Sequence, residues 1–150
     1  MKTLLMAIDN SPVAEKVVAL TLEQAQAQQA QVAVLCCIDP AYSSCNLPIE
    51  IAAGEDPDDF AVAKDEQNTA EKVVRQALAP LLRAGITARG LIVAGEAAET
   101  IVAQANALHA SMIIMGRRPL SPFNRLLKGS VSAAVIEHAR CPVLIDVRKD

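Results

Sequence analysis

One stretch near the C-terminus combines residue types that typically bind anions. An apolar, strand-like run over residues 112–115 ends at Gly116, and the chain then becomes basic and turn-forming over residues 117–124. The segment closes at Gly129-Ser130, where an amphipathic stretch begins. A glycine at a strand exit lets backbone approach a ligand, and Gly-Ser at a helix start presents amide groups and a hydroxyl to an anion. This layout predicts phosphate binding.

Two other phosphate or hydrolase motifs are excluded by residue order. Lys128-Gly129-Ser130 has the wrong order for a Walker loop, and the lysine of that loop is missing. Ser130 is not predicted to be a hydrolase nucleophile, because no strand-Gly-x-Ser-x-Gly elbow surrounds it. His109 and His138 have no paired cysteine or acid pattern, so we expect them to be packed or surface residues rather than ligands or bases.

Length and composition indicate one domain over residues 1–150 with a core of small aliphatic side chains. The chain has a mass of 15.9 kDa, and 52% of its residues are hydrophobic but only 2% aromatic. Aromatic platforms for stacking bases or an isoalloxazine ring are therefore absent, which argues against a nucleic-acid-binding protein and against a flavin electron carrier.

The charge and hydropathy patterns argue against binding to nucleic acid or membrane. The net charge is −3 and the pI about 5.4, so no overall field favours a polyanion. No apolar run approaches the roughly 20 residues of a membrane span. The carboxylate of Asp9 comes too early for a signal peptide. We expect a cytoplasmic protein.

The four cysteines lack the spacing of a metal site. Cys36, Cys37 and Cys141 lie in apolar runs and are expected to be buried small hydrophobic residues. Cys45 lies in a polar loop and is the only cysteine expected to be reactive. No metal site is predicted.

Apolar runs and helical stripes alternate along the whole chain. Runs too apolar to have a solvent face predict buried strands, and stripes at helical spacing predict helices between them. Such alternation indicates an α/β fold in which right-handed crossovers build a doubly wound parallel sheet with helices on both faces. The expected strands cover residues 4–8, 32–38, 86–93, 112–115 and 143–147, and the expected helices lie at about 12–25, 70–81, 98–108 and 131–138.

Local signals refine these boundaries. Ser11 is expected to cap the first helix with Pro12 in its first turn, and Gly85 to end the second helix. Pro80 lies inside the second helical pattern and should kink or shorten it. Residues 40–58 show little periodicity and are expected to form a surface excursion, either a lid over a ligand or a solvated loop without a role.

In open parallel sheets, ligands bind outside the carboxyl ends of the strands, where the strand order reverses. Asp9 follows the first predicted strand and Gly116 ends the fourth. If those strands are neighbours, one crevice collects Asp9 and the segment from Gly116 to Ser130.

The spacing of Gly116, Gly129 and Ser130 resembles the nucleotide loop of the universal stress protein family, which reads Gly, two residues, Gly, nine residues, Gly, then Ser or Thr. The resemblance covers nearly the whole chain, with Asp9, Gly95 and residues 141–144 matching other family positions. It implies a five-stranded parallel sheet of order 3-2-1-4-5, dimerisation through the last strand, and in one branch ATP bound at the crevice.

Carried over by position, the resemblance implies a nucleotide site. Asp9 and Cys37 would flank the adenine, Met115 and Gly116 the ribose, and Gly129, Ser130, Val131 and Ser132 the phosphates. Arg117 and Arg118 either turn inward to add charge or, as adjacent loop arginines usually do, stay solvated.

The chain departs from the family pattern at two positions. Ser111 stands where the family more often has Asp, and Pro119 replaces the second glycine of the loop. Proline fixes φ and has no N–H, so one charge-assisted contact is lost, at about 1.5–3 kcal/mol or ten- to a hundredfold in affinity.

Two functional hypotheses follow. The first is a stress-response protein that weakly binds an adenine nucleotide, ATP or AMP, with magnesium only alongside the nucleotide. The alternative, motivated by Pro119, is a protein that binds no nucleotide and acts through homodimer and protein contacts. An enzymatic function has little support beyond slow ATP hydrolysis, since no positioned base is visible.

A homodimer is expected through the strand Val143 to Val147, although Asp146 interrupts its apolar edge.

Overall fold

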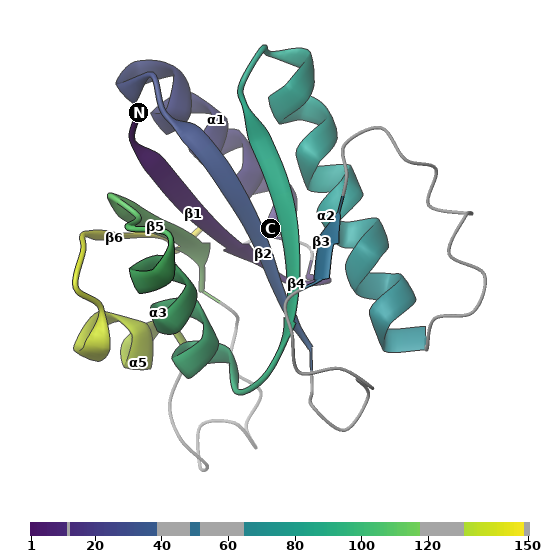
Figure 1. Ribbon diagram of the computed structural model, residues 1–150, viewed down its shortest axis with the longest axis vertical. Coiled ribbons are helices and arrows are strands. Elements are labelled where there is room, and N and C mark those ends of the chain that lie inside the picture. The colour runs from purple at the N-terminus through teal and green to yellow at the C-terminus, as the bar shows by residue number, and fades with distance from the viewer. Residues whose placement is uncertain (12, 39–48, 52–64, 118–130, 149–150) are drawn as a thin grey trace.

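The computed structural model describes residues 1–11, 13–38, 49–51, 65–117 and 131–148. Within them, strands and helices alternate along the chain except where β3 follows β2, as Figure 1 shows. The elements are β1 (Thr3–Ile8), α1 (Ala14–Gln28), β2 (Gln31–Ile38), β3 (Ile49–Ile51), α2 (Asp65–Arg83), β4 (Ala88–Ala94), α3 (Ala97–Ala107), β5 (Met112–Gly116), α5 (Val131–His138) and β6 (Val143–Asp146).

The strands form one sheet of order β3-β4-β2-β1-β5-β6. Strands β1, β2, β4, β5 and β6 are parallel to one another, and when these five are numbered in chain order they give the predicted arrangement 3-2-1-4-5. The short β3 was not predicted. It pairs antiparallel with the outer side of β4, from inside the segment 40–58 that was expected to be irregular. Three residues are too few to show a period of two, so the sequence carries no signal for it.

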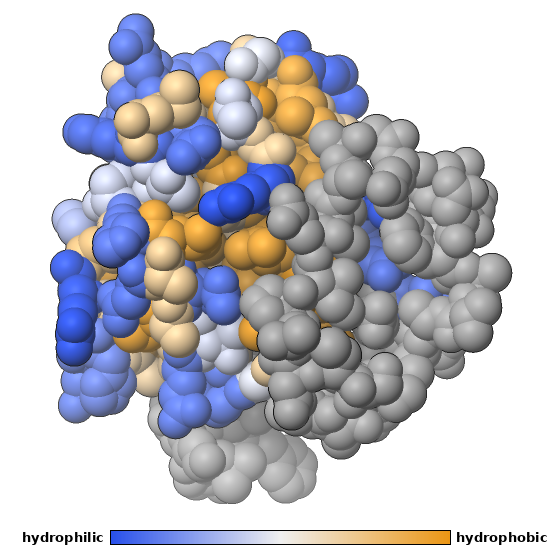
Figure 2. Space-filling model, in the orientation of Figure 1, coloured by the Kyte–Doolittle hydropathy of each residue, from blue (hydrophilic) through white to orange (hydrophobic). Residues whose placement is uncertain are grey.

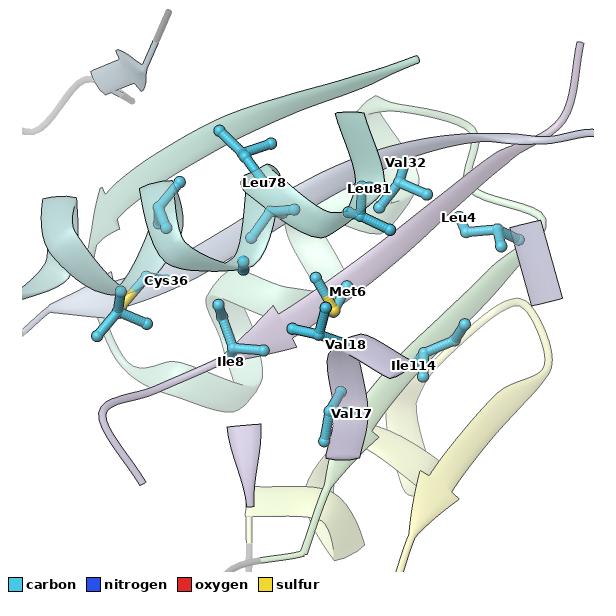
Figure 3. Packing of buried hydrophobic residues seen from close by; sticks show 14 of the residues in the cluster. Leu4, Met6, Ile8, Val17, Val18, Val32, Cys36, Leu78, Leu81 and Ile114 are labelled. Atoms are coloured by element: carbon cyan, nitrogen blue, oxygen red, sulfur yellow. The ribbon is translucent and has the colours of Figure 1, made fainter. Parts of the chain in front are cut away.

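Strand β1 is buried on both faces at the middle of the sheet. Its six residues are all buried, because successive side chains point to opposite faces and both faces are covered by helices. Leu4, Met6 and Ile8 belong to one core with α1 and α2, whereas Leu5 and Ala7 belong to a second core with α3 and α5. Figure 3 shows the first core, in which Met6 lies among residues of α1, α2 and β5.

Pro80 was predicted to kink or shorten the second helix. Helix α2 continues past Pro80 to Arg83, so the shortening is wrong. A proline removes only its own amide donor, and the Pro80 carbonyl still accepts a hydrogen bond from the Ala84 amide at 3.2 Å. The helix then ends as predicted at Gly85, whose φ of +80° is in the left-handed region. The Ile86 amide donates back to the Leu81 carbonyl across this turn.

Helix α1 begins differently from the prediction. Its N-cap is Val13, which makes no side-chain capping bond, and Pro12 lies outside the described residues. The carbonyl of Ser11, rather than its hydroxyl, accepts from the Ala14 amide at 3.1 Å. The Ser11 Oγ is buried without a hydrogen-bond partner among the described residues.

The amino edge of the sheet is joined by polar contacts around Thr3. The Ser111 amide donates to the Thr3 carbonyl at 2.8 Å, and the Ser111 hydroxyl donates to the same oxygen at 3.2 Å. The Gln31 side chain donates to the Thr3 Oγ1 at 2.9 Å. The serine at position 111 therefore stabilises the edge opposite to the predicted site.

Both hydrophilic and hydrophobic side chains reach the surface of the described residues. On the face shown in Figure 2, hydrophobic residues are visible mainly in the centre, between hydrophilic groups. The most exposed large hydrophobic side chains among the described residues are Met1, Leu82, Val131, Ile136 and Val147. None of the described helices is both long enough and apolar enough to span a membrane.

The edge strand β6 ends in a buried carboxylate. The Asp146 side chain is 4% exposed, and Arg148 donates to it through Nε at 2.9 Å, Nη2 at 2.6 Å and its backbone amide at 3.0 Å. These bonds lower the pKa of Asp146 from 3.8 to about 2 against the opposing effect of burial, and Lys16 of α1 adds a smaller attraction. An inward-pointing charge of this kind interrupts the apolar character of an edge strand.

The ion pair between Asp146 and Arg148 makes a pH-dependent contribution to stability. Because the folded-state pKa is lowered, the contribution is complete above about pH 4 and is lost as pH falls through about 2. We expect Asp146→Asn to lower the free energy of unfolding by about 1 kcal/mol at neutral pH, a value reduced for the exposed partner. The difference from the unmodified protein should shrink as the pH falls from 4 to 2. Urea unfolding across this range measures it.

The matched control is Glu137→Gln, which removes a carboxylate from the exposed end of α5. It should change stability little at any pH. An Asp146→Asn deficit of the same size at pH 7 and pH 2 would contradict the assignment.

Candidate functional site

The strand order reverses between β1 and β5. From β1 the chain continues to β2 on one side, whereas β5 and then β6 lie on the other. Ala7 lies opposite Met115 in the register, so the next residues along, Ile8 and Gly116, end the two strands together. Asp9, which is half-buried, and the exposed Arg117 follow them directly. The structure thus makes β1 and β5 neighbours, which was the condition for the predicted crevice at their carboxyl ends.

Gly116 packs closely against α1. A Cβ at this position would lie 3.0 Å from Val17 Cγ2 and 3.3 Å from Val13 Cγ2. The missing side chain therefore lets the first turn of α1 approach the end of β5. From the sequence, this glycine was expected to let a ligand approach the backbone. In the structure, side chains of α1 and its N-cap lie where a Cβ would point.

Gly95 has a similar role at the end of β4. A Cβ there would lie 2.5 Å from Thr100 Oγ1, on the first turns of α3. The Gly95 amide donates to the Ile38 carbonyl at 3.0 Å, which joins the ends of β4 and β2. The glycine thus holds α3 close to the carboxyl edge of the sheet.

Glu96, which the sequence reasoning did not single out, caps α3. Its carboxylate accepts from the Ala98 amide at 3.1 Å and the Glu99 amide at 2.8 Å. The cap occupies the first amides of the helix with a negative charge from the chain itself. Glu96 and Glu99 stand three residues apart at the start of an apolar stripe, and this spacing is a helix-start signal that could have identified the cap.

Cys37 lies at the end of β2, next to β1, and is half-buried rather than fully buried as predicted. Burial, the neighbouring Cys36 and the charge of Glu96 raise its pKa to about 12. The thiol is therefore protonated at neutral pH and offers a weak hydrogen-bond donor instead of a nucleophile. Cys141 is also half-buried, since the strand after it lies at the sheet edge.

The remaining predicted site residues are only partly described. Met115 is 5% exposed within the second core, so its side chain packs against the sheet and helices. Ser132 is buried and Val131 is partly exposed at the start of α5. Four positions central to the motif, Arg118, Pro119, Gly129 and Ser130, lie outside the described residues, as does Cys45.

Other groups do not form a second site among the described residues. His109 and His138 are exposed, which agrees with the prediction of packed or surface residues, and His109 follows the C-cap of α3 with a φ of 52°. No group of three His, Cys, Asp or Glu side chains in the described ranges is placed to hold a metal ion.

The fold and the crevice together define a class. A parallel, doubly wound sheet with its switch point between the first and fourth parallel strands is the architecture of α/β proteins that bind ligands at the strand ends. The family model described as the universal stress protein family matches residues 1–148. The chain belongs to the universal stress protein family.

Relatives and solved structures agree with this assignment. A universal stress protein of Thermus aquaticus is 32% identical over 144 residues, which cover 96% of this chain and 97% of the relative. A universal stress protein of Archaeoglobus fulgidus in complex with dAMP is 21% identical with a TM-score of 0.68, covering 97% of each chain. A family protein of Arabidopsis thaliana with AMP bound is 17% identical with a TM-score of 0.69, covering 99% of this chain and 93% of that one.

The packing role of Gly116 can be measured directly. Gly116→Ala forces a methyl group against Val17, and we expect it to lower the free energy of unfolding by about 1–2 kcal/mol. In a Val17→Ala background, which removes the atom that the new methyl group would meet, the same substitution should cost less. Urea unfolding of the four proteins gives the coupling energy.

If the losses of stability from Gly116→Ala and Val17→Ala simply added in the double variant, the packing role of Gly116 would be contradicted. Close approach of a ligand to the backbone would then remain as the reason for a glycine at this position.

Proposed function

We propose that this protein binds an adenine nucleotide in the crevice between the ends of β1 and β5. The observation that carries the proposal is the register of these strands, which brings Asp9 and Gly116 to one point of the carboxyl edge. Both residues match family positions that the resemblance associates with a nucleotide. Relatives of the same fold in complex with dAMP and with AMP support the choice of an adenine ligand.

The described residues suit the base and sugar better than they suit the phosphates. The half-buried Asp9 supplies an acceptor for the amino group of adenine, and Cys37 lies one strand away with a neutral thiol. Ser132, the second residue of α5, is the buried hydroxyl within the described part of the proposed phosphate segment 129–132. Phosphate would be held by amides at that helix start, and magnesium would enter only with the nucleotide.

Calorimetry with AMP and ATP at millimolar concentration tests the proposal. Binding should be detectable and should weaken about tenfold or more in Asp9→Ala, since a charged acceptor to the base is lost. Glu137→Gln, at the far end of α5, is the control and should bind like the unmodified protein. If neither AMP nor ATP gave a heat of binding at millimolar concentration, the proposal would be overturned.

Pro119 motivates the second candidate, a family member that binds no nucleotide and acts through homodimer and protein contacts. The two candidates differ in what Pro119→Gly does. Under the first, the natural protein binds and the substitution strengthens binding about ten- to a hundredfold by restoring an amide. Under the second, only the substituted protein binds. Equal affinities for the two forms would count against any role of Pro119.

We further propose a cytoplasmic homodimer in which residues 1–150 act as one domain. The support is the edge position of β6, whose Val143, Leu144 and Ile145 are half-buried in the single chain. Val147, just beyond the strand, is 61% exposed. Light scattering at several protein concentrations tests the oligomeric state, and a monomer at every concentration would refute it.

A further inference from the structure

Arg117 extends β5 by one residue and lies beside Asp9 on the same side of the sheet. Its amide donates to the Asp146 carbonyl at 3.1 Å, so the pairing with β6 reaches this residue. Ala7 pairs with Met115, and two residues further along the same strands are Asp9 and Arg117. Because side chains alternate between the faces of a sheet, both point to the face of Ala7 and Met115, which packs against α3 and α5. A carboxylate and a guanidinium thus leave adjacent strands, about 4.8 Å apart at the backbone.

Cys37 continues this row onto β2. Cys36 pairs with Ile8, so Cys37 lies beside Asp9 at the next step of the register. The Cys37 side chain is half-buried against the same core with α3 and α5. Its thiol is protonated at neutral pH, since burial raises its pKa to about 12. A neutral thiol, a carboxylate and a guanidinium therefore form one edge row, made of Cys37, Asp9 and Arg117.

The opposite face of the sheet at the ends of β5 and β6 is occupied by the chain itself. Gly116 points to this face, and a Cβ there would lie 3.0 Å from Val17 Cγ2. Asp146, next to Gly116 in the register, has a side chain that is 4% exposed and bonded to Arg148. Lys16 of α1 attracts the same carboxylate. The polar groups that remain for a ligand of β1 and β5 are those of the edge row.

The charge of Arg117 is not matched in the way that other charges at this edge are. Arg148 donates to Asp146 through two of its nitrogens, and Glu96 accepts from the first amides of α3. Arg117 is exposed, and although it lies beside Asp9, no hydrogen bond or ion pair joins its side chain to another described residue. Its guanidinium therefore keeps all its N–H donors for an anion bound at the edge row.

We propose that Arg117 binds the phosphoryl group of the nucleotide whose base is held at Asp9, on the side of the sheet that carries α3 and α5. The inference rests on the proposed function and adds to it the side chain that recognises the anionic part of the ligand. Asp9 accepts from the amino group of the base. Arg117, one strand away on a long side chain, donates two parallel N–H groups to phosphoryl oxygens. A ligand with a donor at one end and an anion at the other places each group against the opposite charge.

Calorimetry of the full chain with AMP and adenosine tests this inference, because the two ligands differ only in the phosphoryl group. Arg117→Gln should weaken AMP binding about tenfold and leave adenosine binding unchanged, since only AMP loses a charge-assisted contact. Arg117→Lys keeps the charge without the paired donors and should weaken AMP binding only about two- to threefold.

The salt dependence of AMP binding gives a second readout that does not require measurable adenosine binding. Between about 10 mM and 150 mM salt the Debye length falls from about 30 Å to about 8 Å, so the unmodified protein should bind AMP more weakly at the higher salt. In Arg117→Gln this salt effect should be smaller, because the positive charge beside the ligand is gone.

Arg89→Gln is the matched control. Arg89 is an exposed arginine near the start of β4, at the opposite edge of the sheet, and its substitution changes the net charge equally. It should leave AMP binding and its salt dependence unchanged.

Two results with Arg117→Gln would overturn the inference while leaving nucleotide binding intact. Unchanged AMP binding would show that Arg117 is a solvated side chain, and equal losses for AMP and adenosine would show that it does not act on the phosphoryl group. If the unmodified protein bound neither AMP nor adenosine, the proposed function would be overturned instead.

Discussion

Burial of β1 on both faces is the constraint on which the rest of the structure depends. Its six residues contribute alternately to the two cores, so the strand must have helices on both sides and a paired strand along each edge. A strand in that position cannot lie at the border of the sheet, because its backbone groups would lose their partners within the protein interior. The neighbours β2 and β5 leave in opposite directions from it, and this divergence creates the crevice.

The crevice is shaped by contacts that are tight for reasons of packing. Gly116 admits α1 to the end of β5, and Gly95 admits α3 to the end of β4. Two glycines that match family positions therefore set the distance between helices and strand ends.

Several charged groups at the same edge have structural roles. Glu96 caps a helix, and Asp146 holds Arg148 against the last strand. Both carboxylates are thus explained by contacts within the chain itself.

The alternation of apolar runs was sufficient to predict the α/β class, the parallel sheet and helices on both faces, because a strand buried on both sides has to be apolar throughout. The strand order came from the family resemblance, and the pairing of β1 with β5 confirms it. The three-residue β3 was missed because it is too short to show a pattern and depends on pairing with β4, which is distant in sequence. The start of α1 after Ser11 and the continuation of α2 past Pro80 were also missed, because local signals for helix ends do not decide where a helix ends. Among the site residues, the sequence alone determined where Asp9 and Gly116 stand relative to their strands. Only the tertiary structure decided that Gly116 faces α1, that Cys37 is a protonated thiol and that Glu96 occupies the start of α3, because burial and electrostatic fields arise only when separate elements are brought together.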